Sequence, residues 1–127
     1  MKYFIVSILT ILSFSSFAQQ EIKIEEVRNH IGDSVTIRDK IFGGKYIQSV
    51  KGSPTFLNVG DEYPNAPLTL VIWDDTRKQF KAAPEELYKN QQVFITGKIV
   101  LYKDKPEIII TNPKQIEVVT ATPASRQ

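Results

Sequence analysis

The fold of this chain is decided by residues 34–44, which read SVTIRDKIFGG. Apolar Val35 and Ile37 alternate with polar neighbours, and this period of two is typical of a strand with one buried face. The two glycines that follow indicate a bulge or a sharp bend, because glycine reaches backbone angles that strain other residues. The sequence therefore predicts a long first strand that bends near Gly43 and Gly44.

Four more strands are predicted from apolar alternation, apolar runs and turn residues. We expect them at residues 55–59, 68–73, 92–102 and 107–111. Pro84 and the two glutamates after it predict a short helix at 84–88, since proline fits the first helical turn and acids favour its positive end. A lead-in that begins as a strand and continues as a short helix is expected at 21–30, and a last apolar stretch at 116–119 closes the core.

The order of these elements predicts an all-β fold. Five strands, a helix between the third and fourth, a first strand bent at glycine and a short polar turn at 103–106 match the five-stranded oligonucleotide/oligosaccharide-binding barrel, the OB-fold. Closure removes the unpaired edges of a small sheet, and a glycine such as Gly97 permits the tight coiling. The alternative is an open β-sandwich, which ordinarily needs more strands.

The length and composition suit a single domain. The chain has 127 residues, no cysteine, and a formal net charge of +2 from 16 basic and 14 acidic side chains. This length is ordinary for one domain and short for several. A charge this small predicts no partner by itself. We therefore look for function in the placement of particular side chains.

The first 18 residues have the three parts of a secretory signal peptide. Lys2 is the positive region, residues 4–12 are an apolar run, and Ser16-Phe17-Ala18 supplies small residues at the cleavage site. The apolar run is shorter than the ~20 residues that span a bilayer. We expect cleavage after Ala18, and the predicted layout is a signal peptide at 1–18, a lead-in at 19–33, the barrel at 34–119 and a flexible tail at 120–127.

The absence of cysteine bears on the fate of the mature chain. A lipid anchor would need a cysteine at the cleavage point, so we expect a soluble exported product that is periplasmic or secreted. Exported domains of this size often depend on disulfides, and this one must be held by its core instead.

Several segments carry a family likeness. They are residues 54–60 (PTFLNVG), 63–65 (YPN), 70–73 (LVIW), 84–88 (PEELY), 93–99 (VFITGKI) and 102–108 (YKDKPEI). Together they resemble the small bacterial OB domains of the tRNA-anticodon and helicase type, over about residues 35–119. Similar domains occur alone in exported proteins and beside nuclease domains in secreted nucleases. The resemblance implies nucleic-acid binding.

The sequence offers little chemistry for catalysis. Hydrolysis normally needs a nucleophile or a metal with a base positioned to act on it. The one histidine, His30, lies in the lead-in and is expected at the surface or at a helix end. The acidic pairs Asp61-Glu62 and Asp74-Asp75 could hold a hard cation, but acids in loops are commonly only solvated. We predict a protein that is not an enzyme and uses no cofactor or metal.

Ligand binding is expected on the face that OB barrels use, the outer side of the second and third strands with the first-to-second and fourth-to-fifth loops beside it. Single-stranded nucleic acid needs aromatic surfaces for its bases and cations for its phosphates. Phe56 and Asn58 point outward if their neighbours are core, and so does Trp73, although Phe56 and Trp73 could instead pack at a barrel end. The candidate ligand-binding residues are Arg38, Tyr46, Lys51, Phe56, Asn58, Trp73, Tyr102, Lys103 and Lys105.

Local charge favours a nucleic-acid ligand in part. Residues 34–53 carry four bases and one acid, and residues 97–105 carry three bases and one acid, whereas residues 60–75 carry four acids and no base. We predict an exported, non-catalytic module for single-stranded DNA or RNA. The alternative is a cell-envelope OB domain that binds a protein, a glycan or a small ligand, and a third reading is a partner of an exported nuclease.

Overall fold

The computed structural model describes residues 20–120, so the predicted signal peptide and all but the first residue of the predicted tail lie outside it. The strands are β1 (Gln20–Ile22), β2 (Ser34–Tyr46), β3 (Thr55–Val59), β4 (Leu68–Ile72), β5 (Gln91–Tyr102), β6 (Lys105–Ile109) and β7 (Ile116–Val118). The helices are the 3-10 helices η1 (Ile24–His30) and η2 (Pro113–Gln115) and the α-helices α1 (Asp74–Arg77) and α2 (Pro84–Leu87). Among the described residues no helix has the length and apolar character needed to cross a membrane.

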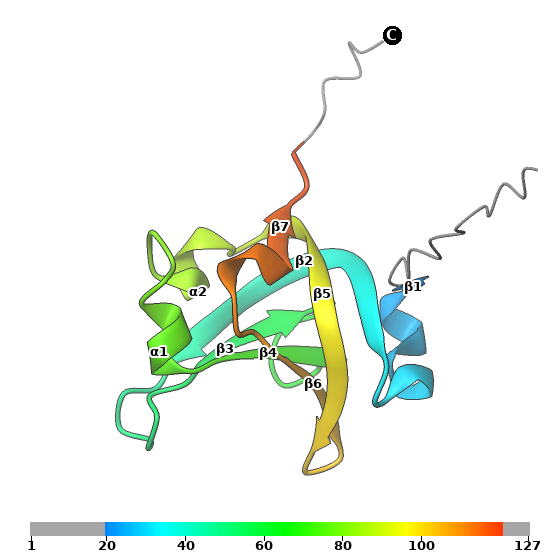
Figure 1. Cartoon of the computed structure of the whole chain (residues 1–127), viewed down its shortest axis with the longest axis horizontal. Coiled ribbons are helices and arrows are strands. Elements are labelled where there is room, and N and C mark those ends of the chain that lie inside the picture. Colours follow the sequence, from blue (N-terminus) through cyan, green and yellow to red (C-terminus); the bar gives the residue numbers. More distant parts are fainter. Residues whose placement is uncertain (1–19, 121–127) are drawn as a thin grey trace, which may run out of the picture.

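Strands β2 to β6 close into a barrel (Figure 1). Antiparallel pairs join β2 to β3, β3 to β4, β5 to β6 and β2 to β5, and a parallel pair joins β4 to β6. The helices α1 and α2 lie between the third and fourth barrel strands in the chain. This connectivity confirms the predicted five-stranded OB-fold.

The predicted bend in the first barrel strand is a β-bulge. Ile41 pairs with Val59 and Gly43 pairs with Asn58, so Phe42 is the extra residue on β2. Gly43 has φ of +149°, and a Cβ on Gly44 would collide with the backbone carbonyl of β3. The two glycines thus let β2 bend and lie close to β3. The bent strand can therefore pair with β5 along its first part and with β3 along its second part.

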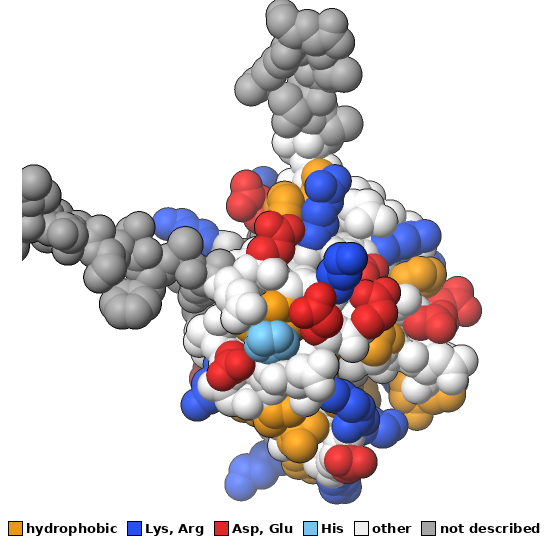
Figure 2. Space-filling view, turned by 90° about the vertical axis from the view of Figure 1, so that its right-hand side faces the viewer, with side chains coloured by type: hydrophobic (Ala, Val, Ile, Leu, Met, Phe, Trp, Pro, Cys, Tyr) orange, Lys and Arg blue, Asp and Glu red, His pale blue; other side chains and the backbone are white. Residues whose placement is uncertain are grey.

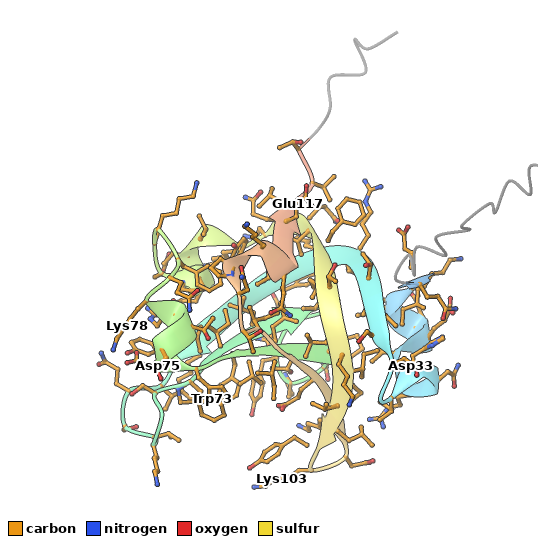
Figure 3. All side chains as sticks on the ribbon, in the orientation of Figure 1. Asp33, Trp73, Asp75, Lys78, Lys103 and Glu117 are labelled. Carbon is orange, nitrogen blue, oxygen red and sulfur yellow. The ribbon has the colours of Figure 1, made fainter. Side chains whose placement is uncertain are left out.

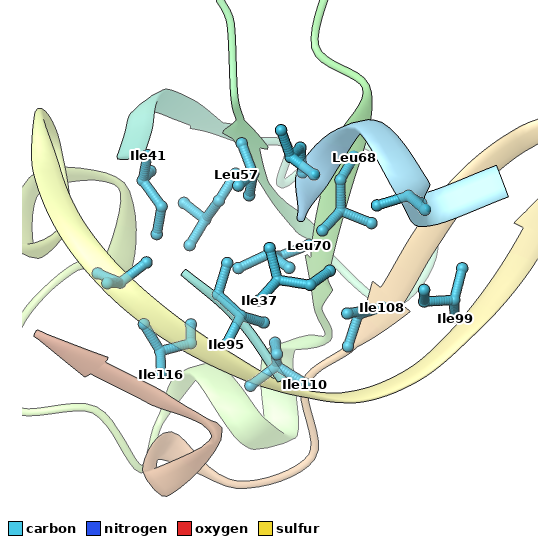
Figure 4. Close-up of a cluster of buried hydrophobic side chains, with 14 of the residues drawn as sticks. Ile37, Ile41, Leu57, Leu68, Leu70, Ile95, Ile99, Ile108, Ile110 and Ile116 are labelled. Atoms are coloured by element: carbon cyan, nitrogen blue, oxygen red, sulfur yellow. The ribbon is translucent and has the colours of Figure 1, made fainter. Parts of the chain in front are cut away.

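The core is a set of aliphatic side chains from every barrel strand (Figure 4). Its central members are fully buried: Ile37, Leu57, Leu70, Ile95 and Ile108. Their neighbours along each strand face outward because side chains alternate across a sheet. Burial of these residues therefore determines which side chains reach the outer surface.

Short elements outside the barrel complete the fold. Strand β1 runs parallel to β2, and β7 pairs with β5 at Val93 to Ile95. The helices α1 and α2 lie at one end of the barrel and η1 at the other (Figure 1). The predicted lead-in, a strand followed by a short helix, is thus confirmed. Between β4 and the predicted helix at 84–88 lies an additional helix, α1, that was not predicted. Its sequence Asp-Asp-Thr-Arg has no apolar residue to predict it.

The turn between β5 and β6 is tighter than expected. Lys103 and Asp104 have φ of +49° and +63°, and they form a two-residue connection that pairs Tyr102 with Lys105. Positive φ at both central residues is characteristic of a type I′ hairpin turn. Strand β6 consequently begins at Lys105 rather than at Glu107, and it ends at Ile109.

Candidate ligand-binding groove

A hollow of about 860 Å³ lies over the outer face of β3, β4 and β6. We call it the groove and define it by its lining residues, which are Ile24, Glu25, Val27, Arg28, Gly44, Lys45, Ile47, Phe56, Asn58, Tyr63, Pro64, Asn65, Ala66, Pro67, Thr69, Tyr102, Lys105, Pro106 and Glu107. Helix η1, the β3–β4 loop and the β5–β6 hairpin contribute its walls. The volume lies within the range of roughly 300–1,000 Å³ that is usual for ligand sites.

The floor of the groove carries a polar row across three strands. Asn58 pairs with Thr69 on β4, and Thr69 pairs with Glu107 on β6. All three are half-buried and face outward, since Leu57, Leu70 and Ile108 beside them point into the core. The row therefore presents an amide, a hydroxyl and a carboxylate to a ligand.

Aromatic side chains stand on the floor and the walls. Phe56 is half-buried on β3, Tyr63 in the β3–β4 loop is 78% exposed, and Tyr102 is exposed at the end of β5. The ammonium of Lys103 lies 5.5 Å from the centroid of the Tyr102 ring. Such rings offer flat faces on which bases or other planar groups can stack.

The charges in the groove have both signs. Arg28, Lys45 and Lys105 are basic lining residues, and Glu25 and Glu107 are acidic. Burial raises the pKa of the Glu107 carboxyl above its ordinary value. The groove therefore combines cations at its rim with one partly desolvated acid on its floor.

Helix η1 is joined to the β5–β6 turn by Arg28. The guanidinium Nη2 donates to the carbonyl oxygen of Asp104 at 3.0 Å, and Nη1 lies 3.8 Å from the Asp104 carboxylate. Both side chains are well exposed, so the ion pair contributes little stability by itself. It does place a cation from outside the barrel over one end of the groove.

Four of the candidate residues line the groove: Phe56, Asn58, Tyr102 and Lys105. Lys103 is next to it in the β5–β6 turn, and Lys51 is exposed in the β2–β3 loop. The prediction that Phe56 and Asn58 face outward is confirmed, because Leu57 and Val59 are fully buried.

Three other candidates lie outside the groove. The Tyr46 hydroxyl donates to Asp74 Oδ1 at 3.1 Å. Trp73 is 43% exposed and packs on the β2–β3 loop, where a Cβ on Gly52 would lie 2.9 Å from its ring. Arg38 lies over the Phe94 ring, 5.5 Å from its centroid, on the part of the barrel where β2 pairs with β5, which we call the β2–β5 wall. Trp73 and Lys103 nevertheless lie on the same side of the barrel, near the two loops expected to flank a ligand (Figure 3).

Most of the lining residues were not predicted from the sequence, and Arg28, Tyr63, Thr69 and Glu107 are among them. For Thr69 and Glu107 the signal was present, since strict alternation from buried Leu70 and Ile108 places them outward. Arg28 and Tyr63 come from η1 and from the β3–β4 loop, and their positions depend on tertiary packing.

The remaining acids and the histidine form local contacts. His30 ends η1, with Nδ1 3.1 Å from Asp33 and Nε2 4.0 Å from Glu26, which confirms its expected helix-end position. The surface around η1 shows basic and acidic side chains interspersed (Figure 2). Within residues 20–120 no three histidine or acidic side chains gather in a way that could hold a metal ion.

Two solved structures of aminoacyl-tRNA synthetases are similar to this chain. One is assigned as an aspartyl-tRNA synthetase from Leishmania major Friedlin, with a TM-score of 0.50 and 14% identity over 87% of this chain. The other is the asparaginyl-tRNA synthetase from Pyrococcus horikoshii, with a TM-score of 0.53 and 13% identity over 81% of this chain. This chain spans 22% and 24% of those proteins, respectively. No protein-family model and no curated protein sequence matches it.

At these identities the likeness concerns the fold, and it agrees with the OB barrel found from strand pairing. A shared fold does not transfer an activity, which depends on the site. What the groove can do must therefore be argued from its own rings, cations and polar floor.

Proposed function

We propose that this protein is an exported, non-catalytic OB module that binds single-stranded nucleic acid in the groove. One observation carries the proposal: three aromatic rings and three cations converge over the outer face of β3 and β4. The rings belong to Phe56, Tyr63 and Tyr102, and the cations to Arg28, Lys45 and Lys105.

Each part of this arrangement fits one part of a nucleic-acid strand. Unpaired bases stack on aromatic faces, and backbone phosphates pair with lysine and arginine. A duplex would hide its base faces from Phe56 and Tyr102, so the rings favour a single strand. The two similar solved structures are tRNA synthetases by name, which supports a nucleic-acid ligand as a class.

The export and the lack of catalysis rest on the sequence. Residues 1–18 have the order of a signal peptide, and the chain contains no cysteine and one histidine. That histidine ends η1 beside Asp33 and Glu26 and does not line the groove. We place the protein in the periplasm or outside the cell, where an exported nuclease or an envelope protein is a candidate partner.

The test is fluorescence anisotropy with a labelled dT oligomer of about twelve nucleotides, a length within the span of one OB fold. We expect a dissociation constant in the micromolar range or weaker that rises with salt. With three cations on phosphates, the logarithm of affinity should fall against the logarithm of salt with a slope of about −2.

Two matched double variants distinguish the effect of the groove cations on the salt slope from the effect of overall charge. The double variant Lys45→Gln with Lys105→Gln should flatten the salt slope by about 1.4, because each cation on a single strand contributes about 0.7. The control, Lys98→Gln with Lys114→Gln, removes two exposed lysines that do not line the groove and should leave the slope unchanged. Absence of binding at low salt would refute the proposal.

A second candidate is a cell-envelope domain whose ligand is a small molecule, a glycan or a protein segment. The observation in its favour is the near balance of charge in the groove, with three bases and two acids around a concave site. Such binding would survive added salt, because it would release few counterions. The same salt titration therefore distinguishes the two functions.

A further inference from the structure

Glu107 is an unusual residue for the floor of a site that would hold a polyanion. Its carboxylate lines the groove on β6, between Thr69 on β4 and Val100 on β5. No described residue forms an ion pair or a hydrogen bond with it. Partial burial disfavours its charged form and raises its pKa. A carboxylate kept in this position is free to accept hydrogen bonds from a ligand.

The surroundings of Glu107 determine which part of a nucleic acid could reach it. Asn58 and Thr69 continue its row across the floor, and the rings of Phe56 and Tyr102 stand beside that row. A base that lies against a ring on the floor would turn its hydrogen-bonding edge toward the row. A phosphate would be repelled by the carboxylate and drawn to the cations at the rim.

We propose that Glu107 selects guanine by accepting hydrogen bonds from the base at the floor of the groove. The inference rests on the proposed function, since it assumes that single strands occupy the groove. Guanine carries an imino N1–H and an amino N2–H side by side, and a carboxylate can accept both at once. No other standard base offers two adjacent donors on that edge.

The remaining bases match the carboxylate less well. Adenine and cytosine each offer one amino group next to a ring nitrogen that accepts, and this acceptor opposes a carboxylate oxygen. Thymine and uracil offer one imino donor between two carbonyl oxygens, which repel the carboxylate. A base that covers Glu107 without donating to it shields the carboxylate from water and gives it no partner, which is costly, so a site of this kind rejects the bases that cannot donate.

The experiment measures anisotropy for labelled heptamers dT3-X-dT3, where X is guanine, hypoxanthine, adenine, cytosine or thymine. A single guanine in a thymine background avoids guanine self-association. We expect the guanine heptamer to bind at least about fivefold more tightly than the thymine heptamer, the low end for a bidentate base contact. Hypoxanthine lacks the N2 amino group, and its heptamer should lie between them.

Variants assign the preference to one side chain. Glu107→Gln keeps the shape and should reduce the difference between guanine and thymine to less than about twofold. Glu25→Gln changes another groove acid, on η1 rather than on the floor, and should keep the full preference. Thermal unfolding of each variant checks that it is folded. The comparison of the five heptamers on the unaltered protein tests guanine selection even if a variant fails to fold.

Each other outcome contradicts the inference in a different way. Salt-sensitive binding of all five heptamers within about twofold would overturn guanine selection and leave the proposed function standing. A guanine preference that persists in Glu107→Gln would overturn Glu107 as the selecting residue. Failure of every heptamer and of the longer dT oligomer to bind would overturn the proposed function, and the inference with it.

Discussion

Arg77 of α1 and Glu85 of α2 form an ion pair with an Nη1–Oε1 distance of 2.6 Å, and only 17% and 14% of their side chains are exposed. The same Nη1 donates to the Thr55 hydroxyl of β3 at 2.7 Å, and the guanidinium lies 3.6 Å from the centroid of the Tyr46 ring. One side chain thus joins both α-helices to β2 and β3. It fixes the end of the barrel opposite η1.

Replacement of Arg77 should therefore destabilise the fold. Arg77→Met leaves the Glu85 carboxylate largely buried without its partner, which costs about 3 kcal/mol in comparable pairs. The free energy of unfolding in urea measures the loss. Lys78→Met is the matched control, because its pair with Asp74 is exposed and should contribute less than about 1 kcal/mol. Equal effects of the two variants would show that the Arg77 contacts do not hold the helices.

Phe56 should carry part of the binding energy for a single strand. Phe56→Ala removes a ring from the groove floor and should weaken oligonucleotide binding by about 1–3 kcal/mol, the usual value for one stacked base. Phe94→Ala is the control, since Phe94 is also half-buried and outward-facing but lies on the β2–β5 wall. Anisotropy titrations compare them, and equal losses in both variants would argue against stacking in the groove.

Glu107 should reduce the stability of the fold as the pH rises. Its pKa is raised in the folded state, so its protonated form favours folding below the ordinary value near 4.5, and that contribution is lost as the pH rises through the raised pKa. Glu107→Gln stays neutral throughout. We expect it to be at least as stable as the unaltered protein at about pH 7, with the difference vanishing near pH 4. Urea unfolding at both values checks this, and a variant that is less stable at pH 7 would contradict it.

Gly97 should be intolerant of a side chain because of packing. A Cβ at this position would lie 2.5 Å from Cγ2 of Ile108 and 3.1 Å from Nε2 of Gln115. Gly97→Ala should cost about 1–3 kcal/mol of unfolding free energy, as overpacked cores do. Lys98→Ala, one residue away and exposed, should stay within about 0.5 kcal/mol. A Gly97→Ala variant as stable as the Lys98→Ala variant would show that β5 and β6 can move apart at little cost.

Much of the barrel could be predicted from the sequence because its signals are local. Alternation around Ile37 and Leu57 sets strand positions and outward faces, and the glycines of β2 mark the bulge. Helix α1 carries no such signal. Its place depends on Arg77, whose partners Thr55 and Glu85 lie 22 and 8 residues away in the chain, outside the helix itself.

The candidate site was predictable on its floor and at the β5–β6 hairpin, but not where η1 and the β3–β4 loop form its walls. Phe56 and Asn58 follow from alternation along one strand. Arg28 reaches the groove only because η1 packs on the barrel and extends to the turn at Asp104, a contact between segments 76 residues apart. Tyr46 shows the opposite case, since it neighbours in sequence the loop expected to flank the ligand, while its hydroxyl donates to Asp74.

An NMR titration locates a single strand on the barrel. In the ¹H–¹⁵N spectrum, addition of the dT oligomer should shift the backbone amides of Phe56, Asn58, Thr69 and Glu107 together, in a salt-dependent way. Amides on the β2–β5 wall, such as those of Arg38 and Phe94, should stay unchanged. Shifts confined to those β2 and β5 residues, or no shifts at low salt, would contradict binding in the groove.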